Sequence, residues 1–151
     1  TEWVGPWNDE AMKFQEAAKY YYYPGMHEPG SMLACGTNKS WFTSLNKSDQ
    51  LLIEAAAAME NDVMMSEYNA KNGAALARLI NDHGVKLEKF SDKVYDGFAG
   101  AANEVFEETR ASSGLAERVH SSFLKARKDI GSWTNLSDSP YISQRNRALG
   151  M

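Results

Sequence analysis

Glu2-Trp3-Val4-Gly5-Pro6-Trp7-Asn8-Asp9 stands at the start of the chain and puts acids, tryptophans, a glycine and a proline on one short connection. A second stretch of similar character, YYYPGMHEPG, runs from Tyr21 to Gly30. Glycine and proline interrupt regular structure, so backbone carbonyls beside them are free to point at a ligand, and binding residues concentrate on such loops. We therefore interpret both stretches as ligand-binding loops.

Strands and one short helix are predicted around these loops. Residues 1–5 are expected to form a short strand, and Asn8 or Asp9 is expected to cap a helix. Four consecutive aromatic residues favour extended backbone at Tyr20–Tyr23. The segment 31–35 is a further candidate strand.

The middle of the chain is predicted to be mainly helical. A short helix should begin near Asn38, and Ser48 is a suitable cap for a long helix from about 49 to 83. Gly84 fits the left-handed conformation that commonly ends a helix. Alternation of apolar and polar residues weakly indicates a strand at 85–90.

Two further helices and a tail complete the pattern. Ser91 is expected to cap a helix that stops near 113–114. The next helix carries a narrow apolar seam from Ala116 to Trp133, which suits packing along another helix. The plainer interpretation, which the pattern alone favours, is an ordinary helix that packs on the domain core. A loop should follow Trp133, and 141–149 is either a last short helix or a frayed tail.

Composition excludes several classes of function. The chain has 151 residues, 43% of them hydrophobic and 24% charged, as in an ordinary globular domain. A net charge of −4 without a local Lys/Arg cluster leaves no positive surface for phosphates, so no nucleic acid partner is expected. The longest apolar run, Leu51 to Met59, is far shorter than the roughly 20 residues of a spanning helix. A single cysteine, Cys35, excludes an intramolecular disulfide.

Motifs of catalysis do not occur in the sequence. The three histidines lack the spacing of zinc ligands, and there is no nucleophile elbow, P-loop or dinucleotide-binding motif. His27 and Glu28 are adjacent, and adjacent side chains of an extended segment point to opposite sides. We therefore expect a protein that is not an enzyme.

Glu2 and Glu28 are the residues that could bind a metal ion. Two carboxylates and a nearby backbone carbonyl form the oxygen set that hard cations such as Na⁺ or Ca²⁺ prefer. From residue types alone the plainer interpretation is favoured, namely two solvent-exposed loop acids, because charged residues usually lie at the surface. Trp7 near this loop suits either a pocket wall or the protein core.

The two loop stretches, together with NKSWFTSL, AAAMENDVMMSEYNAKNGAAL and KDIGSWTNLSD, resemble the TRAP-transporter solute-binding proteins of the DctP type, especially the branch that binds 2-oxo acids. The resemblance covers nearly the whole chain. It implies an α/β fold of the two-lobed, type II-like periplasmic-binding-protein kind, with this chain as its helix-rich C-terminal half. The signal peptide and the first half are then expected upstream of Thr1.

The resemblance also implies roles for particular residues. In that branch the matching EW pair supplies a carboxylate and a backbone carbonyl to a bound cation, and the matching acid of HEPG supplies a second carboxylate. Glu2, Trp3 and Glu28 are therefore the expected metal ligands, and Trp3 and Glu28 the expected substrate contacts. The family's substrate-binding arginine and cation-binding glutamine match no motif here and would lie upstream.

The implied function is that of a periplasmic receptor. It would bind a small organic acid, a 2-oxo or 2-hydroxy monocarboxylate, through a bound Na⁺ or Ca²⁺ and deliver it to the membrane subunits of a TRAP permease. The implied organisation assigns 1–45 to ligand-site strands and loops, 46–112 to long helices, and 113–151 to a C-terminal helix and tail. That last helix would be exchanged between the subunits of a homodimer.

Two other functions remain open. A helical interaction or oligomerisation module using the seam from Ala116 to Trp133 would form a stable oligomer without binding a small molecule. A fragment of a metal-assisted lyase or hydrolase would use Glu2 and Glu28 with a hard cation, but no general-base constellation accompanies them.

Overall fold

A computed structural model describes residues 2–27 and 34–151 of the chain. The chain divides into two compact units, Thr1–Asp92 and Lys93–Met151, which we describe separately. The first unit contains these elements: α1 (Pro6–Ala11), α2 (Phe14–Ala17), β1 (Tyr20–Tyr23), α3 (Lys39–Ser44), α4 (Lys47–Asn81) and β2 (Lys86–Lys89). The helices α5 (Asp92–Ala111), α6 (Gly114–Thr134) and α7 (Asp138–Leu149) follow.

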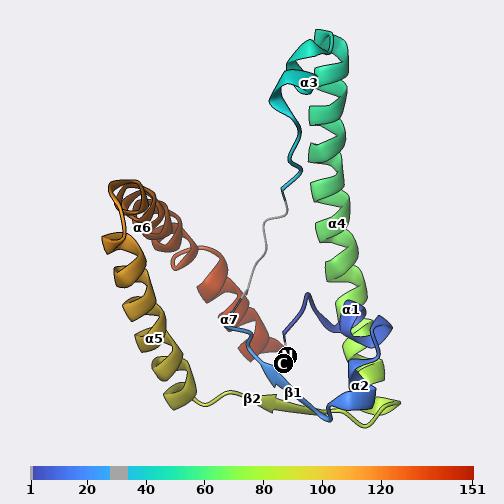
Figure 1. The fold of residues 1–151 in the computed structure, drawn as a ribbon. Helices are drawn as coiled ribbons and strands as arrows, with labels where there is room; N and C mark the ends of the chain where they lie inside the picture. Colours follow the sequence, from blue (N-terminus) through green and yellow to red (C-terminus); the bar gives the residue numbers. More distant parts are fainter. Residues whose placement is uncertain (1, 28–33) are drawn as a thin grey trace. The chain divides into compact units, whose positions relative to one another are not determined.

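The two strands β1 and β2 pair in parallel, with Tyr20 opposite Lys86 and Tyr23 opposite Lys89 (Figure 1). Both strands were predicted from the sequence, and the structure confirms them. The ring of Tyr22 stacks on Phe90 with 4.9 Å between centroids, which adds a side-chain contact where β2 ends. In this pairing the start of β1 lies beside the start of β2, shortly after α4 ends, and Tyr23 lies beside Phe90, whose amide donates to the Tyr23 carbonyl at 2.8 Å.

The long helix α4 is one continuous element of 35 residues, as predicted. Its cap is Asn46 rather than the predicted Ser48, so it begins at Lys47 rather than at about 49, because the Asn46 side chain accepts the amide hydrogen of Asp49 at 2.9 Å. The helix ends before Gly84, whose φ of +67° is the expected left-handed conformation. The predicted helix after Asn38 is also confirmed, since the Asn38 side chain accepts from the Trp41 amide.

Two predictions at the start of the chain need correction. Residues 2–5 form no strand, and residue 1 lies outside the described residues. The helix there begins at Pro6, before the predicted caps Asn8 and Asp9, because proline at the first helical position loses no hydrogen bond and already has a helical φ. Of the candidate strand 31–35, only residues 34 and 35 are described, and they have no regular structure.

The core of the first unit lies where α1 packs against the C-terminal half of α4 (Figure 1). Its buried apolar residues are Ala75, Leu79 and Val85. Tyr68 and Asn72 lie on the same side of α4, at the spacing of three or four residues that aligns side chains on a helix. This stripe of α4 faces the chain from Gly5 to Glu10.

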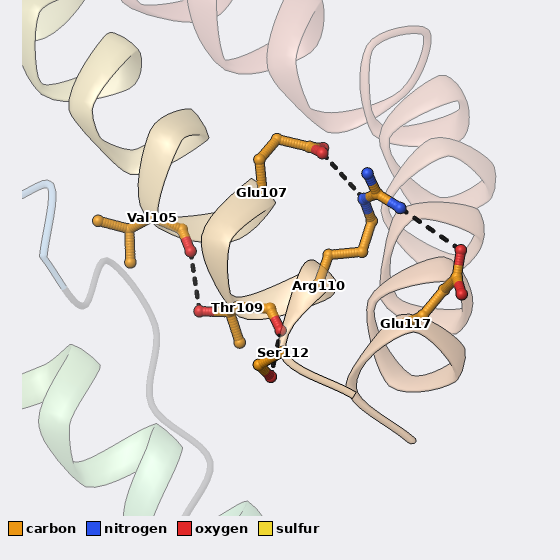
Figure 2. Close-up of polar contacts among 6 residues, drawn as sticks. All are labelled: Val105, Glu107, Thr109, Arg110, Ser112 and Glu117. Atoms are coloured by element: carbon orange, nitrogen blue, oxygen red, sulfur yellow. Dashed lines mark hydrogen bonds and ion pairs between the residues drawn. The ribbon is translucent and has the colours of Figure 1, made fainter. Parts of the chain in front are cut away.

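The second unit is helical throughout its regular elements. Ser113 caps α6 by accepting the Ala116 amide hydrogen at 3.1 Å, so the predicted break near 113–114 is confirmed. Arg110 joins the helices on either side, donating to Glu107 at 2.8 Å and to Glu117 at 3.4 Å (Figure 2). The predicted loop after Trp133 is only a short turn, and the last helix starts at Asp138.

Among the helices of residues 2–27 and 34–151, none combines the length and the apolar character that crossing a bilayer requires.

Candidate functional site

Glu2 and Trp3 lie on the irregular segment that leads into α1. Both side chains are exposed, Trp3 with 54% of its surface accessible. Glu28, the third predicted ligand, lies outside the described residues. The structure therefore places two of the three predicted ligands, both just before α1. That the three ligands assemble into one site stays a prediction.

The segment that carries Glu2 and Trp3 leads into the first residues of α1, which are attached to α4. The Trp7 amide donates to Asn72 Oδ1 over 3.1 Å, across 65 residues of sequence. Gly5 lies so close to this amide group that a Cβ atom there would stand 3.2 Å from Asn72 Oδ1. These contacts fix the position at which the predicted ligand segment meets the folded unit.

The Trp7 side chain is part of the same attachment. Its ring meets Tyr68 edge-on, with 5.3 Å between centroids, and Lys71 Nζ lies 4.0 Å above it. Lys71 also forms an ion pair with Glu67. Of the two roles open to Trp7, the packing role is the one that the structure supports, because aromatic contact and cation–π attraction hold the ring against α4.

A hydrogen bond links α1 to β1. The Tyr21 hydroxyl donates to Asp9 Oδ2 over 2.5 Å, while Asp9 Oδ1 is buried without a partner among the described residues. Burial raises the pKa of Asp9, and the bond from Tyr21 offsets part of that rise. Burial and the adjacent carboxylate raise the pKa of Tyr21, so its hydroxyl stays protonated and remains the donor. This bond ties together the elements that follow Trp3 and precede Glu28.

Glu10 and Arg78 form a second contact between α1 and α4. Arg78 donates from Nε at 2.8 Å and from Nη2 at 2.5 Å to the two oxygens of Glu10. The hydrogen bond from Arg78 lowers the pKa of Glu10, which keeps the carboxylate charged. The two ends of α1 are thus held to α4 by different groups, an amide at the start and a guanidinium at the end.

The donor chemistry of the predicted metal site fits a hard cation. Among residues 2–27 and 34–151, no three His, Cys, Asp or Glu side chains gather as a metal cluster. The predicted set needs only two carboxylates, one of them on Glu28, and a backbone carbonyl. Glu2 is exposed on the segment before α1, and its carboxylate is an oxygen donor of the kind that hard cations prefer.

A shallow depression elsewhere carries none of the predicted site residues. It lies on α6 and is lined by Leu115, Arg118, Val119, Ser122 and Phe123. Val119 and Phe123 belong to the predicted apolar seam. This depression therefore overlaps the seam that was predicted to contact another subunit, and neither Glu2 nor Trp3 lines it.

The ligand roles of Glu2, Trp3 and Glu28 stay a prediction, and sequence reasoning missed the residues that hold the Glu2-Trp3 segment to α4. Asn72, Tyr68 and Arg78 lie more than 50 residues from α1 in sequence, in a stretch that reads only as one helix. A weak signal exists, because Tyr68, Asn72, Ala75 and Leu79 recur at helical spacing. No local pattern says which segment that side of the helix contacts.

Comparison with known proteins adds information that the geometry lacks. Residues 1–112 match the family described as bacterial extracellular solute-binding protein, family 7 (DctP). The chain is similar to a monocarboxylate 2-oxoacid-binding periplasmic protein of Nostoc sp., with 33% identity over 140 residues. That match covers 93% of this chain and 38% of the relative.

Solved structures show the same relationship. A TRAP periplasmic solute-binding protein from Colwellia psychrerythraea with bound calcium and pyruvate matches 95% of this chain, with a TM-score of 0.88 and 33% identity. One from Bordetella bronchiseptica, a dimer with calcium and picolinate, matches 99% with a TM-score of 0.89 and 26% identity. One from Pseudoalteromonas atlantica with sodium and pyruvate matches 94%, with a TM-score of 0.83 and 27% identity. The chain spans 43–44% of the length of these three proteins.

Proposed function

Because the chain belongs to the DctP family of bacterial extracellular solute-binding proteins, we propose that it forms the ligand-binding part of a receptor for a small 2-oxo or 2-hydroxy monocarboxylate. The expected fold class, a helix-rich α/β part of a two-lobed, type II-like binding protein, is confirmed by the structural matches. The observation that carries the proposal is the 33% identity, over 95% of this chain, to a receptor that holds calcium and pyruvate. The alternative function, a helical interaction module, does not explain this similarity to a solute-binding protein.

A bound cation would bridge the acid and the protein. The carboxylates of Glu2 and Glu28 and the carbonyl of Trp3 would hold Na⁺ or Ca²⁺, and both cations accompany pyruvate in similar receptors. A carboxylate that enters a closing cleft loses its water, and pairing with the cation recovers that cost. A 2-oxo or 2-hydroxy oxygen adds a second metal contact, which would select these acids over simple carboxylates.

Binding and delivery, without turnover, complete the proposed role. The receptor would work in the periplasm, as the name of the Nostoc relative indicates for that protein. Closure of two lobes around the acid would create the form that TRAP permease subunits recognise. The family and the Nostoc relative are described as binding proteins, which favours this role over the fragment of a lyase or hydrolase.

Replacing Glu28 tests the proposed site. In the full-length receptor, Glu28→Ala should abolish cation-dependent pyruvate binding while leaving the fold intact, because it removes one of the few oxygen ligands of the cation. Titration calorimetry with pyruvate in Ca²⁺ or Na⁺, and again after chelation of Ca²⁺, measures this. Glu104→Ala, at an exposed acid of α5, is the matched control and should bind as the wild type does. Unchanged affinity of Glu28→Ala would remove this residue from the site.

A further inference from the structure

The start of α1 lacks the side chain that usually satisfies the first free amides of a helix. Its N-cap is Gly5, which has no side chain to accept a hydrogen bond. Pro6 has no N–H group, so Trp7 at the second helical position carries the first amide that needs a partner. Asn72 Oδ1, from α4, accepts that hydrogen at 3.1 Å. A residue 65 positions away thus does the work of a local cap.

The Gly5 backbone also lies close to the Asn72 side chain, with little room between them for another side chain. A Cβ atom on Gly5 would lie 3.2 Å from Asn72 Oδ1 and 3.3 Å from Nδ2, closer than most side chains tolerate. A local cap such as serine at position 5 would therefore compete with Asn72 for the same space. The close approach of Gly5 to α4 depends on the absence of a side chain.

Asn72 is itself held on a rigid support. It lies in the interior of α4, one turn before the buried residue Ala75, and Leu79 is buried in the turn after that. The neighbouring Lys71 and Tyr68 hold the Trp7 ring from the same side of the helix. The backbone of Asn72 therefore lies in the packed part of α4, from which its side chain reaches the Trp7 amide.

Trp3 is only two residues before Gly5, so its carbonyl lies within about 7 Å of that anchor along the chain. A shift at Gly5 would be transmitted directly to this carbonyl and to the Glu2 carboxylate. Residues behind the ligands of a metal site typically change metal affinity by about 10-fold to 100-fold when they are replaced. Resting on the proposed function, we propose that Asn72 is a positioning residue that caps α1 and thereby places the Glu2-Trp3 ligands for the cation and the acid.

Two substitutions at Asn72 separate capping from packing. Asn72→Leu keeps a similar volume but removes the acceptor, whereas Asn72→Asp keeps an acceptor oxygen. In the full-length receptor with Ca²⁺, Asn72→Leu should bind pyruvate about 10-fold to 100-fold more weakly, and Asn72→Asp should stay within about threefold of the wild type. Hydrogen exchange should speed up at the Trp7 amide in Asn72→Leu alone.

Glu10→Gln is the matched control. It weakens the contact with Arg78, which joins the same two helices at the far end of α1. It should lower the melting temperature without changing pyruvate affinity or exchange at Trp7. Equal losses of affinity in Glu10→Gln and Asn72→Leu, or wild-type affinity in Asn72→Leu, would overturn the proposal.

The exchange measurement distinguishes this inference from the proposed function. Exchange at Trp7 needs no ligand, so it reports whether Asn72 caps α1 even in a protein that fails to bind pyruvate. A wild-type receptor without cation-dependent binding would refute the proposed function and the positioning role with it. Wild-type binding with unchanged exchange in Asn72→Leu would refute the positioning role alone.

Discussion

Asp9 is the buried acid that joins α1 to β1, and its environment makes a charged carboxylate costly. One oxygen accepts from Tyr21 and the other is buried without a partner among the described residues. Because burial raises the pKa of Asp9 above that of an unfolded chain, the folded state binds the proton more tightly. The stabilisation from this group is complete below the unfolded pKa of about 3.9 and is lost as pH rises through the folded pKa.

Asp9→Asn should therefore melt at a higher temperature than the wild type at pH 7. The asparagine keeps an acceptor for Tyr21 and carries no charge, so the advantage should shrink as the pH falls and Asp9 becomes protonated. Thermal melting monitored by circular dichroism between pH 4 and pH 8 measures the difference. A wild type that is the more stable protein at pH 7 would show that the charge of Asp9 is needed for the fold.

At the scale of elements, the start of α4 shows how a local signal can select a different residue from the one predicted. Asn46 and Ser48 both have side chains suited to capping a helix. Asn46 caps because its Oδ1 accepts from Asp49, and its Nδ2 also donates to the Asp49 carboxylate at 2.8 Å. That carboxylate lies in the first turn, where it also interacts favourably with the helix dipole.

Asn46→Ala should destabilise the first turn of α4 by about 1 kcal/mol. Ser48→Ala, the control inside the same turn, should change stability little because Ser48 does not cap. Amide hydrogen exchange at residues 49–52 measures the local opening. A larger effect from Ser48→Ala would contradict the cap observed in the structure.

At the scale of the whole molecule, the two units differ in how much they bury. The first has a small core of Ala75, Leu79 and Val85, whereas α6 and α7 contain no buried residue and expose large apolar side chains. On α6, Val119 is 61% exposed and Ile130 63%. Such surfaces usually mark contact with other protein.

Homodimerisation through α6 stays a prediction, although the Bordetella relative is described as a dimer. In the full-length receptor, Phe123→Ser should weaken a dimer built on this seam, because it removes a large apolar side chain. Lys128→Ser, on the same helix and outside the seam, should not. Sedimentation velocity across a concentration series measures the dissociation constant, and a dimer unaffected by Phe123→Ser would exclude the seam as its interface.

Local patterns in the sequence were enough for most elements. The aromatic run at Tyr20–Tyr23, the apolar periodicity of α4 and the glycine at position 84 each carry their conformational preference within a few residues. The first helix was misplaced because Pro6 outweighs the caps that follow it. The predicted loop after Trp133 was longer than the observed turn. The polar residues there favoured a loop, but a helix already starts at Asp138.

By itself the sequence determined the family, the order of most helices and strands, and the chemical type of the predicted ligands, since these depend on neighbouring residues or on motifs. Only the tertiary structure showed that Asn72 caps α1, that Tyr21 bonds to a buried Asp9, and that Arg78 holds Glu10. Each of these contacts joins residues that are distant in sequence or whose geometry depends on packing. A hydrogen bond forms only where the folded chain brings donor and acceptor within about 3 Å, and no local pattern specifies that distance.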